Sequence, residues 1–221
     1  AYIETEKTME SGLDDKGVRL DVYVNDDKGT VYNIEMQTYK NMPELIKRSR
    51  FYHSAIDHYS MEKGADYMTL NDCFVIFICT FPIFSGKLHK YTYTKKCTEE
   101  LGRELGDGLT TIFLSTKAQM NDVSELLQNF LDYVDGRPPA DGLLQQMDEV
   151  VHVVKQSKEW RGEYMKLEMD RKKYWREGKK EGTLEAIVGM LREKLSVEMI
   201  ARITNMPVDQ VIQIGKEHAL L

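Results

Sequence analysis

Alternating apolar and polar positions open the readable part of the chain. Residues 18–24 and 31–38 each alternate in this way, and the turn-forming segment 25–29 separates them. Period-two alternation on both sides of a short Asp- and Gly-containing segment is typical of a β-hairpin, so we expect two antiparallel strands here. We interpret residues 1–16 as a charged connecting segment. Because the chain begins with Ala1 rather than Met, we also expect that an N-terminal element is missing.

Helix and strand patterns alternate through the next hundred residues. Asn41 and Pro43 form a plausible helix start, and apolar side chains recur at helical spacing from there to Gly64. The apolar run 74–78 is continuous, which indicates a strand buried on both faces. The remaining predicted elements are two strands at 88–94 and 111–114 and a helix that follows Asp122. This order indicates an α/β protein with helices against a sheet.

The clearest break in the chain is the Gly- and Pro-containing segment 136–139. Beyond it the pattern is helical to the end. Residues 159–182 carry dense charges of both signs, which is typical of a solvated helix, and Gly178 and Gly182 are expected to mark its frayed end. Residues 184–221 are expected to form three short helical stretches. We therefore divide the chain into a core at 1–135, a linker and charged helix at 136–182, and a small helical module at 183–221.

The last part of this module resembles a helix-turn-helix. Ser196 is placed to cap one helix, Asn205 and Pro207 are placed to form the turn, and 208–214 has the pattern of the next helix. Such a unit is a candidate for reading DNA. The second helix carries one cation, Lys216, among acidic and amide side chains. A packing or dimerisation module, which would make the chain a homo-oligomer through its C-terminal helices, is therefore at least as good an interpretation.

Composition and charge set bounds on function. The 221 residues are 42% hydrophobic and 30% charged, which excludes a disordered or collagen-like chain. With 36 acidic and 30 basic residues the net charge is −6, which argues against a uniformly basic nucleic-acid coat but not against a local basic groove. The three cysteines are not spaced as they are in zinc sites or in redox motifs. They therefore favour reduced thiols and a cytoplasmic protein. The longest apolar run is too short to cross a bilayer, so we expect no membrane partner.

The predicted hairpin places two carboxylates opposite each other. With its turn centred near Lys28, Asp21 lies opposite Glu35. Alternation then predicts a polar face made of Arg19, Asp21, Tyr23, Asn33, Glu35 and Gln37, and a core face made of Leu20, Val22, Val24, Tyr32, Ile34 and Met36. Opposed carboxylates repel, and a bound divalent cation offsets that repulsion. Hard carboxylate oxygens suit Mg²⁺ or Mn²⁺, which retain waters and bind substrate phosphate.

Spacing alone favours a simpler interpretation of the same residues. Polar strand faces that point to solvent are common. In such a hairpin Arg19 would pair with one or both carboxylates, and no metal would be needed. A choice between the two interpretations therefore depends on further residues.

Three stretches of the chain carry a resemblance to a known family. They are Gly-Val-Arg-Leu-Asp-Val-Tyr-Val at 17–24, Tyr-Asn-Ile-Glu-Met-Gln at 32–37 and Arg-Ser-Arg-Phe-Tyr at 48–52. Together they resemble the PD-(D/E)XK nuclease family transposases, also called the Rpn or recombination-promoting nuclease family. The similarity continues through 72–84, 163–165 and 177–182. It implies a restriction-endonuclease-like mixed sheet flanked by helices, with an all-helical C-terminal tail, and a DNA endonuclease that uses Mg²⁺ or Mn²⁺ and is associated with transposition or recombination.

The resemblance also implies roles for individual residues. Asp21 matches the metal-binding aspartate of the family, and Glu35 matches the acidic residue of its (D/E)-x-K motif. Gln37 stands where the wider superfamily has lysine, although the family itself resembles this sequence in carrying glutamine. A glutamine orients water or donates a neutral hydrogen bond, whereas a lysine supplies a charge. We expect Asp21, Glu35 and Gln37 to be the catalytic residues.

Positive charge for the substrate phosphate is then expected from nearby residues. Lys40, Lys47 and Arg48 follow the second strand or lie in the first turns of the next helix, and Tyr52 shares a helix face with Arg48. Packing and ordinary surface charge explain Arg48 and Tyr52 equally well. The alternative for the whole chain is a catalytically degenerate nuclease fold that acts as a DNA- or protein-binding module.

Overall fold

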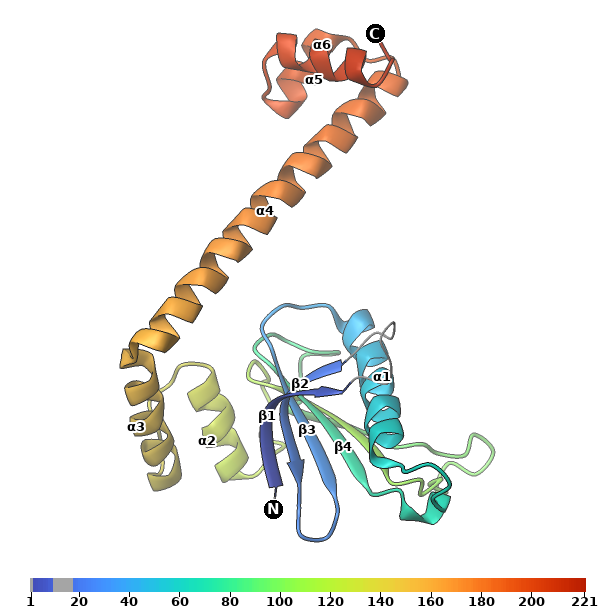
Figure 1. Ribbon diagram of the computed structural model, residues 1–221, viewed down its shortest axis with the longest axis vertical. Helices are drawn as coiled ribbons and strands as arrows, with labels where there is room; N and C mark the ends of the chain where they lie inside the picture. The colour runs from blue at the N-terminus through green and yellow to red at the C-terminus, as the bar shows by residue number, and fades with distance from the viewer. Residues whose placement is uncertain (1, 10–17) are drawn as a thin grey trace. The chain divides into compact units, whose positions relative to one another are not determined.

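The computed structural model describes residues 2–9 and 18–221. The chain divides into two compact units, Ala1–Met147 and Asp148–Leu221 (Figure 1). Gly17 of the first motif stretch and residues 10–16 of the expected connecting segment lie outside the described residues. Each unit has a hydrophobic core of its own, so each is considered separately.

The first unit is built on a six-stranded mixed sheet in the order β1-β2-β3-β4-β6-β5. Its strands are β1 (Tyr2–Met9), β2 (Val18–Asn25), β3 (Val31–Gln37), β4 (Cys73–Cys79), β5 (Lys90–Tyr93) and β6 (Leu109–Ser115). The central strands β3, β4 and β6 are parallel, and the outer strands pair antiparallel with their neighbours. The predicted mixed sheet flanked by helices is confirmed.

The strand β1 corrects the prediction of a connecting segment near the N-terminus. Tyr2–Met9 pairs antiparallel with β2 at every position except Glu6. Its charged residues hid the strand from periodicity, because an edge strand tolerates charge. Lys7 is nevertheless buried, with its ammonium over the rings of Tyr2, Tyr23 and Tyr59 and 2.9 Å from a Glu4 carboxylate oxygen.

The predicted hairpin register is confirmed for Val22 to Asn25, whereas the expected pair of Asp21 with Glu35 is not part of the ladder. Tyr23 faces Asn33 and Val22 faces Ile34 across β2 and β3. The predicted division into a polar face and a core face is wrong, because helices cover both faces of the sheet and Asn33 and Glu35 are buried at 0% and 1% exposure. Met36, expected in the core, is 43% exposed.

The alternation also changes phase within β2. Leu20 and Tyr23 are both buried in the same core cluster, although strict alternation places them on opposite faces. The β2–β3 ladder extends only from Asn25 to Val22, whereas Val18, Arg19 and Leu20 stay paired with β1. The break in the ladder lies beside Asp21.

Two helices cover the two faces of the sheet. The helix α1 (Met42–Ser60) follows β3, starts with Pro43 in its first turn as predicted, and is followed by the short 3-10 helix η1 (Tyr67–Thr69). Leu45, Tyr52 and Ile56 of α1 pack in one cluster with Val75, Phe77 and Phe113 of the sheet. The helix α2 (Glu125–Val134) packs on the opposite face with Ile76, Ile78 and Leu114. The strand β4 is therefore buried on both faces, as its continuous apolar run predicts.

The rest of the chain is helical, as predicted. The helix α3 (Gly142–Gln156) spans the boundary between the two units and is followed by α4 (Lys158–Arg192), α5 (Val197–Thr204) and α6 (Val208–Glu217). The expectation that Gly178 and Gly182 mark a frayed helix end is wrong, because both glycines lie inside α4, which is 35 residues long and ends at Arg192. The end of α4 enters the C-terminal core with Ile187 and Leu191, and this burial offsets the low helix propensity of the glycines.

The helix-turn-helix geometry follows the sequence closely. The Ser196 side chain caps α5 by accepting a hydrogen bond from the Met199 N–H. Asn205 ends α5 in the left-handed conformation with φ of 52°, and Pro207 precedes α6. None of the helices in the described part of the chain is both long and apolar enough to cross a membrane.

Candidate functional site

The strands β2 and β3 part where two carboxylates meet. Beyond the Val22–Ile34 pair, hydrogen bonds to side chains take over from the ladder. The Asp21 N–H donates to Oε1 of Glu35 at 3.2 Å, and the Met36 N–H donates to Oδ2 of Asp21 at 3.1 Å. The structure therefore brings the two predicted metal-binding residues together at the parting of the strands.

The two carboxylates differ strongly in their surroundings. Asp21 is exposed, whereas the side chain of Glu35 is only 2% exposed beneath α1. Burial raises the pKa of Glu35, and the negative charge of Asp21 raises this pKa further. The Asp21 N–H and the positive charge of Arg48 act in the opposite direction, yet the pKa of Glu35 stays above its usual value. This carboxylate is consequently easier to protonate than a surface glutamate.

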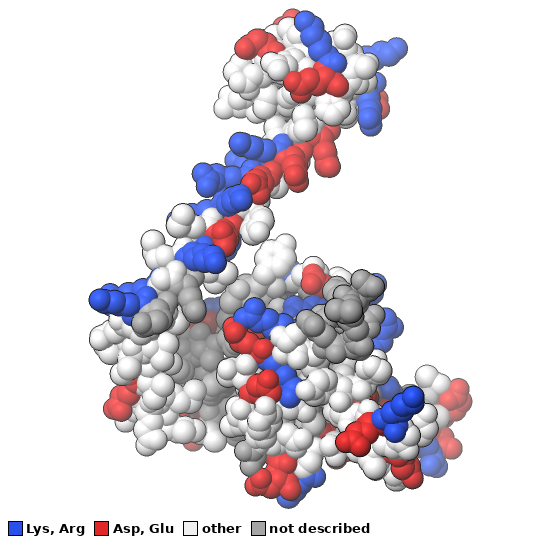
Figure 2. Space-filling model, in the orientation of Figure 1, with Lys and Arg blue, Asp and Glu red and all other residues white. Residues whose placement is uncertain are grey.

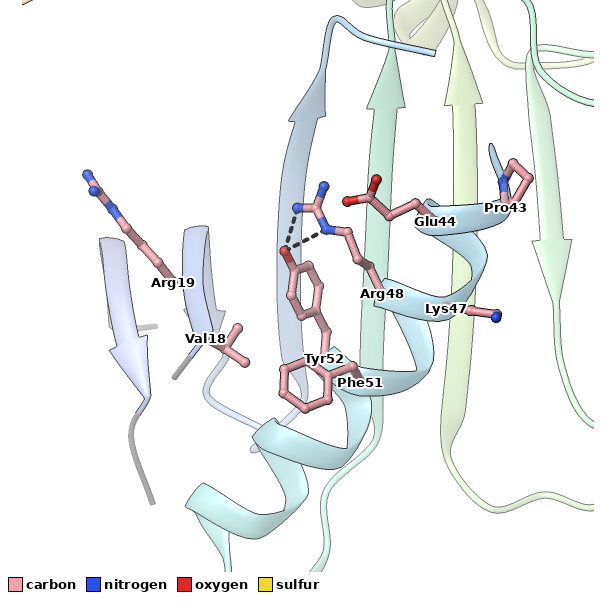
Figure 3. Close-up of a pocket in the computed structure, with 8 residues that line it drawn as sticks. All are labelled: Val18, Arg19, Pro43, Glu44, Lys47, Arg48, Phe51 and Tyr52. Carbon is pink, nitrogen blue, oxygen red and sulfur yellow. Dashed lines mark hydrogen bonds between the residues drawn. The ribbon is translucent and has the colours of Figure 1, made fainter. Parts of the chain in front are cut away.

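Arg48 on α1 links the second carboxylate to the rest of the cluster. Its Nη2 lies 3.2 Å from Oε2 of Glu35, and its Nη1 donates to Oε1 of Gln37 at 3.2 Å. Its Nε donates to the Tyr52 hydroxyl at 3.1 Å (Figure 3). This hydroxyl lies 3.4 Å from Oε2 of Glu35. Glu35, Gln37, Arg48 and Tyr52 therefore form one polar cluster between β3 and α1.

Burial is also the largest influence on the pKa of Tyr52, and it raises this pKa above its usual value. The pKa of Arg48 is raised by its partners, with the hydrogen bond to Tyr52 as the largest favourable influence, although burial alone would lower it. The guanidinium therefore stays charged beside Glu35. Arg19, the cation expected in a simple polar hairpin, pairs instead with Glu6 at 2.5 Å, so Arg48 rather than Arg19 neutralises the buried carboxylate.

A cavity of about 580 Å³ opens between α1 and the start of β2 beside this cluster. Its lining residues are Val18, Arg19, Pro43, Glu44, Lys47, Arg48, Phe51 and Tyr52 (Figure 3). Lys47, Arg48 and Tyr52 were expected at the site, and all three line the cavity. Lys47 is exposed and points away from the Arg48–Tyr52 pair, and Lys40 is exposed between β3 and α1 without lining the cavity.

Sequence reasoning missed Glu44 and Phe51 in this cavity. Glu44 lies one helical turn before Arg48 and its charge raises the pKa of Arg48. The four-residue spacing of Glu44, Arg48 and Tyr52 was a usable signal for a shared helix face. Phe51 had no such signal, because an exposed aromatic residue next to a buried one has no distinctive pattern.

The donor set fits a hard divalent cation. Across residues 2–9 and 18–221, no group of three or more His, Cys, Asp or Glu side chains is placed to hold a metal ion. Mg²⁺ needs fewer protein ligands than such a group supplies, because it binds through one or two carboxylates and completes its shell with water and substrate phosphate. Asp21 supplies one exposed carboxylate and Glu35 a second, buried one beside it, and two carboxylates are as many as Mg²⁺ uses.

Comparisons with known proteins identify the family. The model of the PD-(D/E)XK nuclease family transposases matches residues 1–135, which contain the sheet, α1 and the polar cluster. No curated protein and no solved structure matches the chain. The family implies a restriction-endonuclease-like fold, in agreement with the mixed sheet and its flanking helices. Because the match extends over more than half of its length, the chain belongs to the PD-(D/E)XK nuclease family transposases.

Proposed function

We propose that this protein is a metal-dependent DNA endonuclease that hydrolyses phosphodiester bonds in transposition or recombination. The observation that carries the proposal is the exchange of hydrogen bonds between Asp21 and the β3 backbone and between Glu35 and the β2 backbone. This exchange holds two carboxylates at one point in spite of their mutual repulsion. Membership of a nuclease family supports the same chemistry.

Each residue of the cluster has a proposed role. Asp21 and Glu35 would hold Mg²⁺ or Mn²⁺, with the Met36 carbonyl as a further oxygen. When bound, such an ion activates a water and offsets the charge that develops on the phosphodiester. Gln37 orients the attacking water through its amide. Arg48 supplies the positive charge that lysine supplies elsewhere in the superfamily, and it is already hydrogen-bonded to Gln37.

The cations around the cavity are proposed to position the substrate. Lys47 lines the cavity with its ammonium exposed, and Lys40 is exposed between β3 and α1. Both are suited to phosphate contacts, which orient DNA without reading its sequence. Tyr52 is proposed to position Arg48 rather than to touch the substrate, because its hydroxyl is occupied by Arg48 and Glu35.

Plasmid and linear DNA incubated with the purified chain and Mg²⁺ or Mn²⁺ test this proposal. Asp21→Asn and Glu35→Gln should each abolish cleavage and weaken metal binding in calorimetry. Glu44→Gln removes a carboxylate from the same cavity without touching the Asp21–Glu35 pair, so it should cleave at close to the wild-type rate. Cleavage that persists equally in wild type, Asp21→Asn and Glu35→Gln would show that another protein or another site is responsible.

A second candidate function is a DNA- or protein-binding module without cleavage. The observation in its favour is that Arg48 already neutralises Glu35 at 3.2 Å, while Gln37 brings no charge of its own. In that case calorimetry would detect no Mg²⁺ or Mn²⁺ binding by the wild type, and DNA affinity would be the same in Asp21→Asn as in the wild type.

A further inference from the structure

The C-terminal unit has a surface groove of its own. The groove has a volume of about 620 Å³ and lies between the end of α4 and the turn that joins α5 to α6. Its lining residues are Arg176, Lys179, Lys180, Thr183, Leu184, Thr204, Met206 and Ile214. Three of these residues are cations and none is acidic. The groove is therefore basic in a chain whose net charge is −6.

The three cations of the groove are available to an outside anion. Within the described part of the chain, Arg176, Lys179 and Lys180 form no ion pair with a carboxylate. Arg176 uses only its Nε internally, as a donor to the Lys172 carbonyl at 3.2 Å, and the ammonium of Lys179 lies 5.2 Å from the ring centre of Trp175.

The threonines of the groove are less available than the cations. The Thr183 hydroxyl donates to the Lys179 carbonyl and the Thr204 hydroxyl donates to the Ile200 carbonyl, both at 2.8 Å. Each hydroxyl has a single proton, so neither can also donate to a ligand. The guanidinium and the two ammonium groups are consequently the side-chain donors that remain for an anion in this groove.

The groove continues a basic face that runs along α4. Spacings of three and four residues place Lys172, Arg176, Lys179 and Thr183 along one side of the helix. The acidic residues of the same region follow the opposite side of the helix and are Asp170, Glu177, Glu181 and Glu185. Figure 2 shows this separation, with Lys and Arg side chains along one side of α4 and Asp and Glu side chains along the other.

We propose that the groove and the basic face of α4 bind the sugar–phosphate backbone of DNA without reading its base sequence. The inference rests on the proposed function, in which DNA is the substrate, and adds a second contact for it. Lys172 and Lys180 are eight residues apart, or about 12 Å along the helix, which spans several phosphates of one strand. The apolar floor formed by Leu184, Met206 and Ile214 suits the deoxyribose faces between phosphates.

Backbone binding fits α6 better than base reading does. In a helix-turn-helix the second helix presents the side chains that contact base edges. Here α6 carries Lys216 as its one cation and begins with Asp209 in its first turn. The favourable charge lies on α4 instead, and contacts to phosphates carry no sequence information.

The test compares two sets of substitutions in the full-length chain. The groove variant carries Arg176→Ala, Lys179→Ala and Lys180→Ala, and the control variant carries Lys158→Ala, Arg161→Ala and Lys166→Ala. Both variants remove one arginine and two lysines from exposed positions of α4, so the net charge changes equally. Fluorescence anisotropy with a labelled duplex in Ca²⁺ should show a tenfold or greater loss of affinity for the groove variant and a smaller loss for the control.

The salt dependence identifies the kind of contact. The slope of log affinity against log salt should become shallower by about 2 to 3 in the groove variant, because about 0.9 is lost for each phosphate contact removed. A duplex of scrambled sequence should bind as tightly as the first. An equal loss of affinity in both variants, or an unchanged salt slope in the groove variant, would overturn the proposal. Selective binding of one sequence would overturn backbone recognition.

The outcome can be separated from that of the proposed nuclease activity. If DNA is cleaved, the groove variant should still cut at low salt and high DNA concentration, where the missing contacts matter least. If neither wild type nor any variant cuts DNA, but the groove variant alone loses affinity and salt dependence, the proposed nuclease activity fails and the groove assignment stands. A groove variant that loses affinity for an acidic peptide but binds DNA like the wild type would assign the groove to a protein partner and overturn the proposal.

Discussion

In the proposed site, Arg48 and Gln37 together take the role that a single lysine has in the wider superfamily. The two side chains are hydrogen-bonded at 3.2 Å, and Arg48 also reaches Glu35. Under this proposal, a cation on the helix replaces a cation on the strand. It would explain how glutamine at 37 is compatible with charge stabilisation, which glutamine alone cannot supply.

If Arg48 supplies the charge that lysine supplies elsewhere, then variants at positions 37 and 48 should affect cleavage together. Arg48→Ala should lower cleavage by about 100- to 1,000-fold, the range seen when one preorganised charge-stabilising donor is removed. Gln37→Lys should not raise cleavage, because it places a second cation against Arg48. The combination of Gln37→Lys with Arg48→Ala should restore much of the rate. Arg50→Ala is the matched control, since Arg50 is an exposed arginine two positions after Arg48 on α1 and does not line the cavity.

Steady-state rates of the four proteins give the coupling between positions 37 and 48. If the double variant is as slow as the product of the two single effects, the charge at these positions is not interchangeable. Arg48 would then act through Glu35 alone. A rate for Gln37→Lys well above that of wild type would contradict the proposed role of Arg48.

The buried His53 is expected to make the folding stability of the first unit depend on pH. Burial lowers its pKa from 6.5 to about 4, and its Nε2 lies 3.0 Å from the Thr111 hydroxyl. The unfolded chain therefore binds a proton between pH 6.5 and pH 4 that the folded chain does not bind, so folding stability is lost as the pH falls through this range. The loss from this residue amounts to at most about 3 kcal/mol.

Hydrogen exchange of the β4 and β6 amides at several pH values measures this effect in the first unit. His53→Gln should flatten the fall in protection between pH 6.5 and pH 4, because glutamine does not titrate. His58→Gln, an exposed position on the same helix, should retain the wild-type pH dependence. Identical pH profiles for wild type and His53→Gln would show that His53 is not the group responsible.

At the scale of elements, periodicity was a good guide wherever one face of an element was buried. It predicted the hairpin, its register, α1, β4 and the helix-turn-helix, each of which is present. It failed for β1, whose buried Lys7 depends on three tyrosines from separate parts of the chain. It also failed to predict which residues of the hairpin are buried, because the hairpin sequence does not show that helices cover both of its faces.

The same limit applies to the candidate site. The local pattern placed Asp21 opposite Glu35, because they belong to one hairpin, and the family resemblance then favoured a metal site over a simple polar face. The contact between Glu35 and Arg48 depends on how α1 crosses β3, and that crossing is set by packing of the whole sheet against the helix. Sequence spacing could place Arg48 near the site but could not give the buried ion pair.

The two glycines inside α4 make a prediction at the element scale. A methyl group added at Gly178 or Gly182 would meet nothing within 4 Å apart from its chain neighbours and the backbone of its own helix, and neither glycine has the positive φ that would require it. Gly178→Ala and Gly182→Ala should each stabilise the C-terminal unit by about 0.5 to 1 kcal/mol, because alanine loses less backbone freedom in a helix.

Urea unfolding followed by tryptophan fluorescence measures this gain, because both tryptophans of the chain, Trp160 and Trp175, lie on α4. Gly215→Ala is the contrasting control. A methyl group at Gly215 would displace the Leu221 side chain and crowd Leu191, so this variant should gain no stability. If Gly178→Ala lowers the urea midpoint, then the straight helical path through Gly178 is not the preferred one.

At the scale of the whole molecule, a net charge of −6 describes DNA binding poorly. The acidic excess includes the exposed carboxylate of Asp21, whose charge opposes that of a phosphate in the proposed site until a cation is bound there. The basic groove of the C-terminal unit carries the opposite charge. Affinity for DNA should therefore depend on two local fields of opposite sign, and salt and divalent cations should act on them differently.

This separation of fields predicts how DNA affinity depends on divalent ions. At matched ionic strength, the wild type should bind a duplex about five- to tenfold more tightly in Ca²⁺ than in a chelator, because offsetting one charge close to a phosphate in water is worth about 1 kcal/mol. Asp21→Asn should lose most of this difference, since it removes a proposed ligand of the ion. The groove variant should bind more weakly in both media and retain the ratio between them, because its contacts need no metal. Anisotropy titrations of the three proteins in the two media measure these ratios, and equal wild-type affinities in Ca²⁺ and chelator would mean that no ion joins Asp21 and Glu35 to the substrate.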